Sequence, residues 1–178
     1  MARLPELVQG AIDQEGEVRE WVDKVKDAER QYFVGWGPNV STAYEAPLKI
    51  KETSYIVTEG FELEQYLHGL FCATDSRTAV TFIAPPGAGR DRVTDEIGAV
   101  KAVAGHAVAL VDEDDTEVSP LVDTTIHLPE TAEPLTPLVY LVPLQLFTYW
   151  LALELGRNPD LFRQDDPDHR VARAKYQL

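Results

Sequence analysis

The amino-acid sequence predicts a three-layer α/β/α fold, in which helices cover both faces of a doubly wound, mostly parallel sheet of five strands. Short apolar runs alternate along the chain with longer segments of helical periodicity, and each run is apolar nearly throughout. Strands of that kind are buried on both faces, as in a parallel sheet covered by helices. The chain has 178 residues, 44% of them hydrophobic, and no internal repeat or linker. It therefore fits one domain over residues 1–178.

The N-terminal residues 1–28 are predicted to form a single amphipathic helix. Their apolar side chains recur at helical spacing between charged residues; they are Leu4, Val8, Ile12, Val18, Trp21, Val22 and Val25. The α/β core is expected over residues 29–156, and residues 157–178 form a polar, charged C-terminal tail.

The core begins with a β-rich run at residues 31–35, followed by a glycine-containing turn. A second helix comes next, and Asn39 or Ser41 can cap its first amide groups. A short extended piece is expected near residues 55–57, and a further helix over residues 61–68. Ligands of doubly wound folds bind beyond the carboxyl ends of the strands, so we expect the site at that edge.

The second half of the core continues the alternation. Strands are predicted at residues 79–84, 106–111 and 124–128, with a helix at about residues 90–104. The closing segment, residues 135–155, approaches the length of a membrane span. It contains two prolines and a glutamine, so we expect a buried or subunit-interface helix instead.

The composition excludes several classes of function. A formal net charge of -14 disfavours general binding to nucleic acids or anionic membranes. The single cysteine, Cys72, excludes an internal disulfide framework and a cysteine-rich zinc site, and its apolar neighbours predict a buried, inert thiol. The acidic start of the chain is unlike a signal peptide, so we expect a cytoplasmic protein.

One face of the second helix gathers charged residues. Glu45, Lys49 and Glu52 stand at i, i+4 and i+7, whereas Lys51 points away from that face. They form either a salt-bridge ladder on an exposed helix or part of an acid–base site. His68, sixteen residues after Glu52, is either a helix C-cap or a third member of that site. A carboxylate, an ammonium and an imidazole are the groups that sugar-phosphate isomerisation requires.

The run EAPLKIKETSYIVTEGFELEQYLHG carries a family resemblance. It resembles the second sugar-isomerase (SIS) half of the glucosamine-6-phosphate synthases, the glutamine–fructose-6-phosphate aminotransferases, whose pattern reads close to E-G-A-L-K-L-K-E-x-S-Y-I…H-G-P. The segments LPELV, AVTFIAPP and PLVYLVPLQLFTYWLALELGRNPD extend the likeness over most of the chain. The resemblance implies the SIS fold, which is flavodoxin-like.

The resemblance also implies roles for individual residues. Glu52 matches the general base that moves a proton between C1 and C2 of the sugar. Lys49 matches the lysine associated with the open-chain sugar, and His68 matches the ring-opening histidine that reaches the site from the adjacent subunit. Glu45 and Lys175 are candidate substrate contacts, Lys175 as the lysine that closes over the sugar.

The sequence departs from the family pattern in three places. Leu70 replaces the proline after His68-Gly69, the tail is closer to those of stand-alone SIS proteins, and the first SIS half with its Ser/Thr-rich phosphate loop is missing. The turn here offers only Ser41 and Thr42. Either a partner chain provides the phosphate loop, or the protein binds a phosphosugar weakly, or the sequence is an excised half. Three interpretations of function stay open: an isomerase module lacking the glutaminase domain, a non-catalytic phosphosugar-binding or regulatory domain, and a subunit of an aminosugar-phosphate deaminase or deglycase.

The expected ligand is a hexose phosphate or an aminosugar phosphate, and the expected partner is another SIS chain in a homodimer or heterodimer. No cofactor and no metal site are predicted, because His106 and His127 resemble core or edge histidines and His169 has no partner nearby in sequence. The loop at residues 85–92 lacks the motifs of phosphate loops. The acidic run at residues 112–117 is expected to be a solvated loop.

Overall fold

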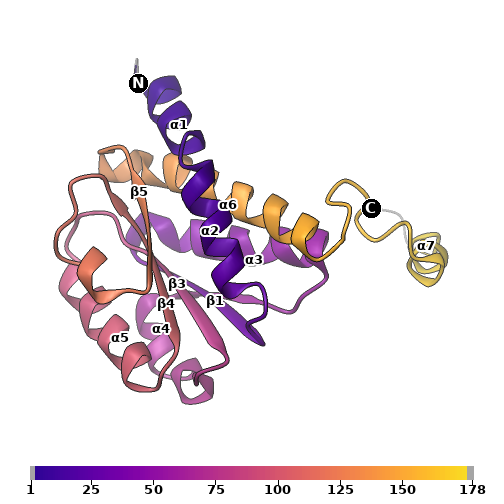
Figure 1. The fold of residues 1–178 in the computed structure, drawn as a ribbon, viewed down its shortest axis with the longest axis horizontal. Helices are drawn as coiled ribbons and strands as arrows, with labels where there is room; N and C mark the ends of the chain where they lie inside the picture. Colours follow the sequence, from indigo (N-terminus) through magenta and orange to yellow (C-terminus); the bar gives the residue numbers. More distant parts are fainter. Residues whose placement is uncertain (1–2, 176–178) are drawn as a thin grey trace.

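In the computed structural model, which describes residues 3–175, five parallel strands form one sheet in the order β2-β1-β3-β4-β5 (Figure 1). The strands are β1 (Arg30–Gly35), β2 (Glu59–Glu62), β3 (Thr78–Ile83), β4 (His106–Asp112) and β5 (Thr124–Leu128). The order reverses between β1 and β3, as in a doubly wound sheet. The predicted fold class is thus confirmed.

Helices cover the sheet from both sides. One face packs against α1 (Leu4–Ile12), α2 (Glu15–Val25), α3 (Val40–Ser54) and α6 (Thr136–Glu154). The other face packs against α4 (Leu63–Leu67) and α5 (Arg90–Ala102). Short 3-10 turns η1 (Gly37–Asn39), η2 (Leu70–Ala73), η3 (Ser119–Leu121) and η4 (Glu133–Leu135) join these elements.

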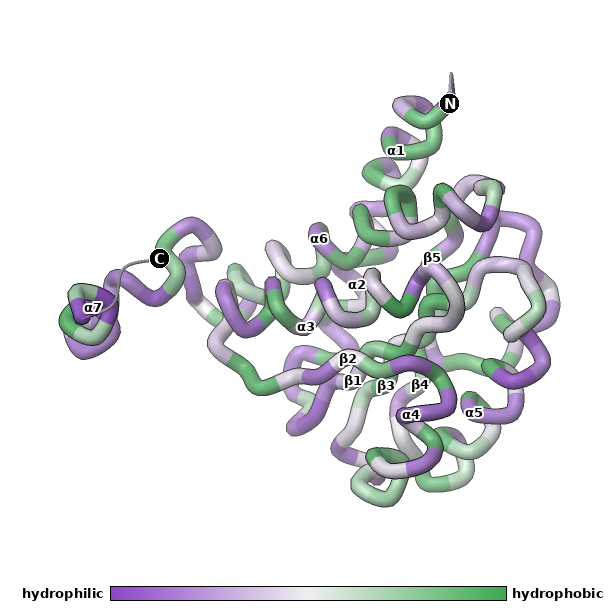
Figure 2. Tube along the Cα trace, turned by 180° about the vertical axis from the view of Figure 1, so that it is seen from behind, coloured by the Kyte–Doolittle hydropathy of each residue, from purple (hydrophilic) through white to green (hydrophobic). Residues whose placement is uncertain are grey.

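Helix α6 is the centre of the larger core. Its Phe147 ring stacks on Trp21 of α2, with the ring centroids 3.9 Å apart. Helix α6 also contacts α1 and α3. Hydrophobic residues recur along its whole length (Figure 2). The stretch Glu133–Glu154 is long and apolar enough to cross a membrane, but half of its most apolar window is buried. Its packing agrees with the expectation of a buried or subunit-interface helix, because one side lies in the core while Leu138, Tyr149 and Leu153 are exposed.

The N-terminal segment differs from its prediction, because it forms two helices instead of one. Helix α1 ends at Asp13, whose amide donates to Gln9 and Ala11 carbonyls, and α2 begins at Glu15. Both helices pack against α6. A side chain at Gly10 would collide with Pro129, so α1 is held close to the end of β5.

The region after α3 also differs from its prediction. Helix α3 ends at Tyr55, whose backbone is left-handed (φ 63°), and β2 forms only from Glu59, four residues later than expected. Pairing with β1 sets this position, since Phe33 pairs with Gly60. Only glycine fits there, because a Cβ would collide with the Ala43 carbonyl of α3. Helix α4 is correspondingly shorter, and the Glu62 carboxylate caps it.

Two local predictions were wrong, and the tail has a helix that was not predicted. Neither Asn39 nor Ser41 caps α3: the Asn39 side-chain amide donates to Thr136 Oγ1 (2.8 Å), and Ser41 donates to the Pro38 carbonyl. Cys72 is exposed rather than buried, because it lies in the surface turn η2. The tail contains a helix, α7 (Pro167–Arg173), capped by the Asp166 carboxylate. Helix α7 lies beyond the end of α6, away from the sheet (Figure 1).

Candidate functional site

Helix α3 carries the predicted charged face. The Lys49 ammonium lies 3.0 Å from Glu52 Oε2 and 3.6 Å from Glu45 Oε1, so one cation bridges two carboxylates. The hydrogen bond with Glu52 is the main cause that raises the pKa of Lys49, which keeps its positive charge. Glu52 is the more enclosed acid, with 28% of its side chain exposed.

The end of α3 is positioned by its own sequence. Pro47 has no amide hydrogen to donate to the Ala43 carbonyl, which lies directly against Gly60 of β2. The helix is therefore held against the edge strand. Its left-handed end at Tyr55 stops the helix less than one turn after Glu52 and leaves that carboxylate near the helix terminus.

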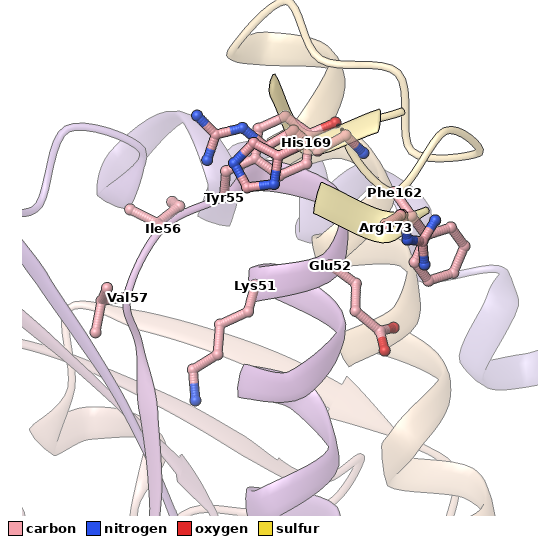
Figure 3. Close-up of a pocket in the computed structure, with 9 residues that line it drawn as sticks. Lys51, Glu52, Tyr55, Ile56, Val57, Phe162, His169 and Arg173 are labelled. Atoms are coloured by element: carbon pink, nitrogen blue, oxygen red, sulfur yellow. Dashed lines mark hydrogen bonds between the residues drawn. The ribbon is translucent and has the colours of Figure 1, made fainter. Parts of the chain in front are cut away.

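A cavity of about 390 Å³ lies between the end of α3 and the C-terminal tail (Figure 3). From α3 and the following turn it is lined by Lys51, Glu52, Tyr55, Ile56 and Val57, and from the tail by Phe162, Arg163, His169 and Arg173. Lys51 and Glu52 project to different sides of the helix, and Glu52 extends on the side of Phe162 and Arg173 (Figure 3). The cavity has the size of a small-molecule site. It lies after the end of α3 and before the start of β2, beside the amino ends of the strands, and not at the carboxyl edge expected from the sequence.

Tyr55 holds the tail over this cavity. Its hydroxyl accepts the backbone N–H of Arg163 at 2.9 Å, and the guanidinium groups of Arg157 and Arg163 lie 5.4 and 5.1 Å from its ring centre. Arg163 also pairs with Asp166 at 3.3 Å. Phe162 and Arg163 both adopt left-handed backbone conformations, which turn the chain back towards α3.

His68 lies elsewhere in the chain. It stands at the C-terminal end of α4, on the opposite face of the sheet from α3, with 76% of its side chain exposed. Its Nε2 atom is 3.5 Å from Glu64, which is itself held by Arg92 at 2.6 and 3.0 Å. One chain therefore does not bring His68 to Glu52. Its predicted role across a subunit interface stays a prediction.

The two substrate-contact candidates also lie outside the cavity lining. Glu45 pairs with Lys49, one turn before Glu52. Lys175 is exposed two residues after α7, and Arg173 lines the cavity instead. The sequence reasoning missed Tyr55, Phe162, Arg163, His169 and Arg173. The signal that points to the tail is its charge, since residues 157–175 hold five of the 16 Lys and Arg but only four of the 30 Asp and Glu.

The acidic run after β4 was expected to be a solvated loop, but part of it is buried around an arginine. Arg90 lies against Asp112 (3.4 Å), Asp115 and Glu117 (3.3 Å), and the Asp115 side chain is fully buried. Asp115 also accepts the amides of Val118 and Ser119. Within residues 3–175, no group of three histidine, cysteine or acidic side chains is arranged to hold a metal ion.

Known proteins that resemble this chain identify its family. The sequence profile of the SIS domain matches residues 24–155. The chain belongs to the SIS domain family. Glu45, Lys49, Glu52 and His68 all lie within the matched segment, whereas the tail residues that line the cavity follow it.

Relatives of this SIS domain include two glutamine–fructose-6-phosphate aminotransferases. The enzyme of Pyrococcus horikoshii is 37% identical over 158 residues, and that of Thermus thermophilus 34% over 160; each match covers about 90% of this chain and 26% of the relative. The chain thus spans about a quarter of the length of these relatives.

Solved structures agree on the fold. The C-terminal domain of the glucosamine-fructose-6-phosphate aminotransferase from Francisella tularensis superposes with a TM-score of 0.79 at 27% identity, covering 87% of this chain and 44% of that one. A glucosamine-6-phosphate deaminase from Thermotoga maritima has a TM-score of 0.70 at 18% identity, over 90% and 47% of the two chains. At that identity the likeness shows the fold alone. The resemblance inferred from the sequence is confirmed by the aminotransferase matches.

Proposed function

We propose that this SIS domain binds a hexose phosphate or an aminated hexose phosphate in the cavity between α3 and the tail, and acts there as an aldose–ketose isomerase module. The observation that supports this best is the position of Glu52. It is a partly enclosed carboxylate, paired with a cation, in a cavity of small-molecule size. The aminotransferase relatives, similar over 89–90% of the chain, favour the same substrate class.

The proposed chemistry is a proton transfer between neighbouring carbons. In an open-chain ketose, the Glu52 carboxylate removes a proton from C1, the C1–C2 double bond forms, and the electron pair of the carbonyl moves onto O2. Delivery of the proton from Glu52 to C2 and transfer of the O1 proton to O2, with the C1–O1 double bond replacing the C1–C2 double bond, complete the aldose. The Lys49 ammonium, 3.0 Å from the Glu52 carboxylate, places positive charge beside the developing enediolate.

We further propose that a second SIS chain completes the site. His68 is exposed on the opposite layer, where it is available to a neighbouring subunit as the ring-opening group. Exposed apolar residues on α3 and α6 offer a surface for such an assembly; they are Tyr44, Leu48, Leu138, Tyr149 and Leu153. The acidic chain carries no net attraction for nucleic acids, and we place it in the cytoplasm.

The decisive experiment follows hydrogen exchange at the sugar carbons. Fructose 6-phosphate is incubated with the protein in deuterated water, and loss of the C1 proton signal is followed by NMR. Glu52→Gln should slow exchange by about 10²–10⁴-fold, whereas Glu20→Gln, an exposed acid on α2, should leave it unchanged. Unchanged exchange in the Glu52 variant would overturn the assignment. Binding without any exchange in the wild type would identify a non-catalytic phosphosugar-binding domain.

A further inference from the structure

The usual positions for an anion in this fold are already occupied. In the turn after β1, Ser41 donates its hydroxyl hydrogen to the Pro38 carbonyl, and Thr42 is buried against Asn39. In the turn after β3, the Arg90 guanidinium lies among three carboxylates of its own chain. Neither turn presents a hydroxyl or a cation that is free to hold a phosphate.

The C-terminal tail presents an arginine and a histidine that are free in this sense. His169 and Arg173 stand at i and i+4 on α7, so they share one face of the helix, and both line the cavity that contains Glu52 (Figure 3). In the part of the chain that the structure describes, neither side chain is paired with a carboxylate. The Arg173 guanidinium lies 5.8 Å from the Phe162 ring centre, a contact that orients it without neutralising its charge.

From these observations we infer that His169 and Arg173 form the phosphate subsite of this cavity, so that the tail holds the phosphate of the sugar while Glu52 faces its carbons. The inference rests on the proposed function and deepens it, because it assigns the end of the ligand that each side of the cavity receives. A guanidinium can donate two parallel hydrogen bonds to a phosphate, and an imidazole nitrogen can add a third.

The charge arrangement sets the direction of the ligand. On the α3 side the cavity is lined by Lys51 and by Glu52, whose carboxylate pairs with Lys49. On the tail side the described lining has Arg163, His169 and Arg173 and no carboxylate to repel a phosphate. Arg163 is committed to Tyr55 and Asp166, so it anchors the tail and leaves His169 and Arg173 for the ligand. These residues lie after residue 155, where the match to the SIS domain ends. The subsite therefore belongs to this tail and not to the matched segment.

The test compares two arginines of the same helix. Arg173→Gln and His169→Gln remove a cavity-lining group, whereas Arg170→Gln removes an equal charge from an exposed position of α7 outside the lining. Affinity for fructose 6-phosphate, for inorganic phosphate and for unphosphorylated fructose is measured by titration calorimetry on the full chain. Arg173→Gln should weaken fructose 6-phosphate binding by about 10–100-fold, with a smaller loss in His169→Gln and little change in Arg170→Gln.

Several outcomes would overturn the subsite: equal weakening by the Arg170 and Arg173 variants, unchanged affinity in Arg173→Gln, or a wild-type protein that binds fructose as well as its phosphate. The proposed isomerase function is separable from these results. If Arg173→Gln loses affinity while the wild type exchanges no C1 proton, the subsite stands and the isomerase function fails. If exchange requires Glu52 but the tail variants bind fructose 6-phosphate as tightly as the wild type, the isomerase function stands and the subsite fails.

Discussion

Arg90 and Arg173 both lie near carboxylates, but their surroundings differ. Arg90, at the start of α5, is 11% exposed and contacts Asp112, Asp115 and Glu117. Arg173, on α7, lines a cavity that also contains Glu52 and has no carboxylate partner among the residues described. The first cation is satisfied by its own chain and stabilises a loop. The second has its charge available for a ligand, so unsatisfied charge beside open volume distinguishes the binding site from the structural one.

Removing the satisfied cation should have the largest effect on stability. Arg90→Met leaves the fully buried Asp115 without its cation, and we expect the free energy of unfolding to fall by about 3 kcal/mol. Urea denaturation measures the change. Arg77→Met, which breaks exposed ion pairs with Glu29 and Asp75, is the matched control and should change stability far less. Equal losses in the two variants would contradict the structural role of Arg90.

Glu96 extends the comparison to a buried acid, because it has no partner whereas the acids around Arg90 share a cation. Glu96 on α5 is 1% exposed, and neither of its oxygens has a hydrogen-bond partner. Burial, reinforced by Glu64 and Glu62 and opposed by Arg92, raises the pKa of Glu96 to about 8. The native state therefore keeps a proton that the unfolded chain releases above its ordinary pKa of 4.5, so stability should fall as pH rises from about 5 to 8.

Glu96→Gln should remove this slope, because the amide cannot ionise, and the variant should be more stable than the wild type near pH 8. Urea midpoints measured from pH 5 to pH 8 test the prediction. Asp95→Asn, which changes the exposed neighbour of Glu96, should keep the wild-type slope. A Glu96 variant with an unaltered pH dependence would show that another group controls stability in this range.

Loosening the contact between Tyr55 and the tail should have the smallest energetic effect of these changes. Tyr55→Phe keeps the ring under the two arginines but removes the hydroxyl that accepts the Arg163 amide. Loss of one such hydrogen bond corresponds to about 1 kcal/mol, or about 5-fold in sugar-phosphate affinity. Amide hydrogen exchange should accelerate at residues 157–173. Thr94→Val, which removes a hydroxyl that donates to the Arg90 carbonyl within α5, should alter neither quantity.

The features that could be predicted depend on interactions between residues close in the sequence, and the missed features depend on interactions between distant ones. Strands β3 and β4 were predictable because each is a mostly apolar run buried on both faces. Strand β5 was predictable from its β-branched residues, and its buried and half-buried residues alternate. The Glu45–Lys49–Glu52 face was predictable because it depends only on helical spacing. Both properties are local in the sequence.

The missed features depend on contacts between distant residues. The position of β2 is set by its pairing with β1 and by the close approach of Gly60 to Ala43. The apolar residues before β2, on which the prediction was based, do not set it. The cavity exists because Arg163 reaches Tyr55, 108 residues earlier in the chain. No periodicity in the tail indicates this contact. His169 therefore looked isolated in the sequence although it lines the same cavity as Glu52.

A crystal structure with fructose 6-phosphate tests the central claim most directly. The account predicts the phosphate against His169 and Arg173 of α7, with C1 and C2 beside the Glu52 carboxylate. A sugar phosphate bound instead at the turn beside Arg90, or on Ser41 and Thr42 with the tail cavity empty, would contradict it.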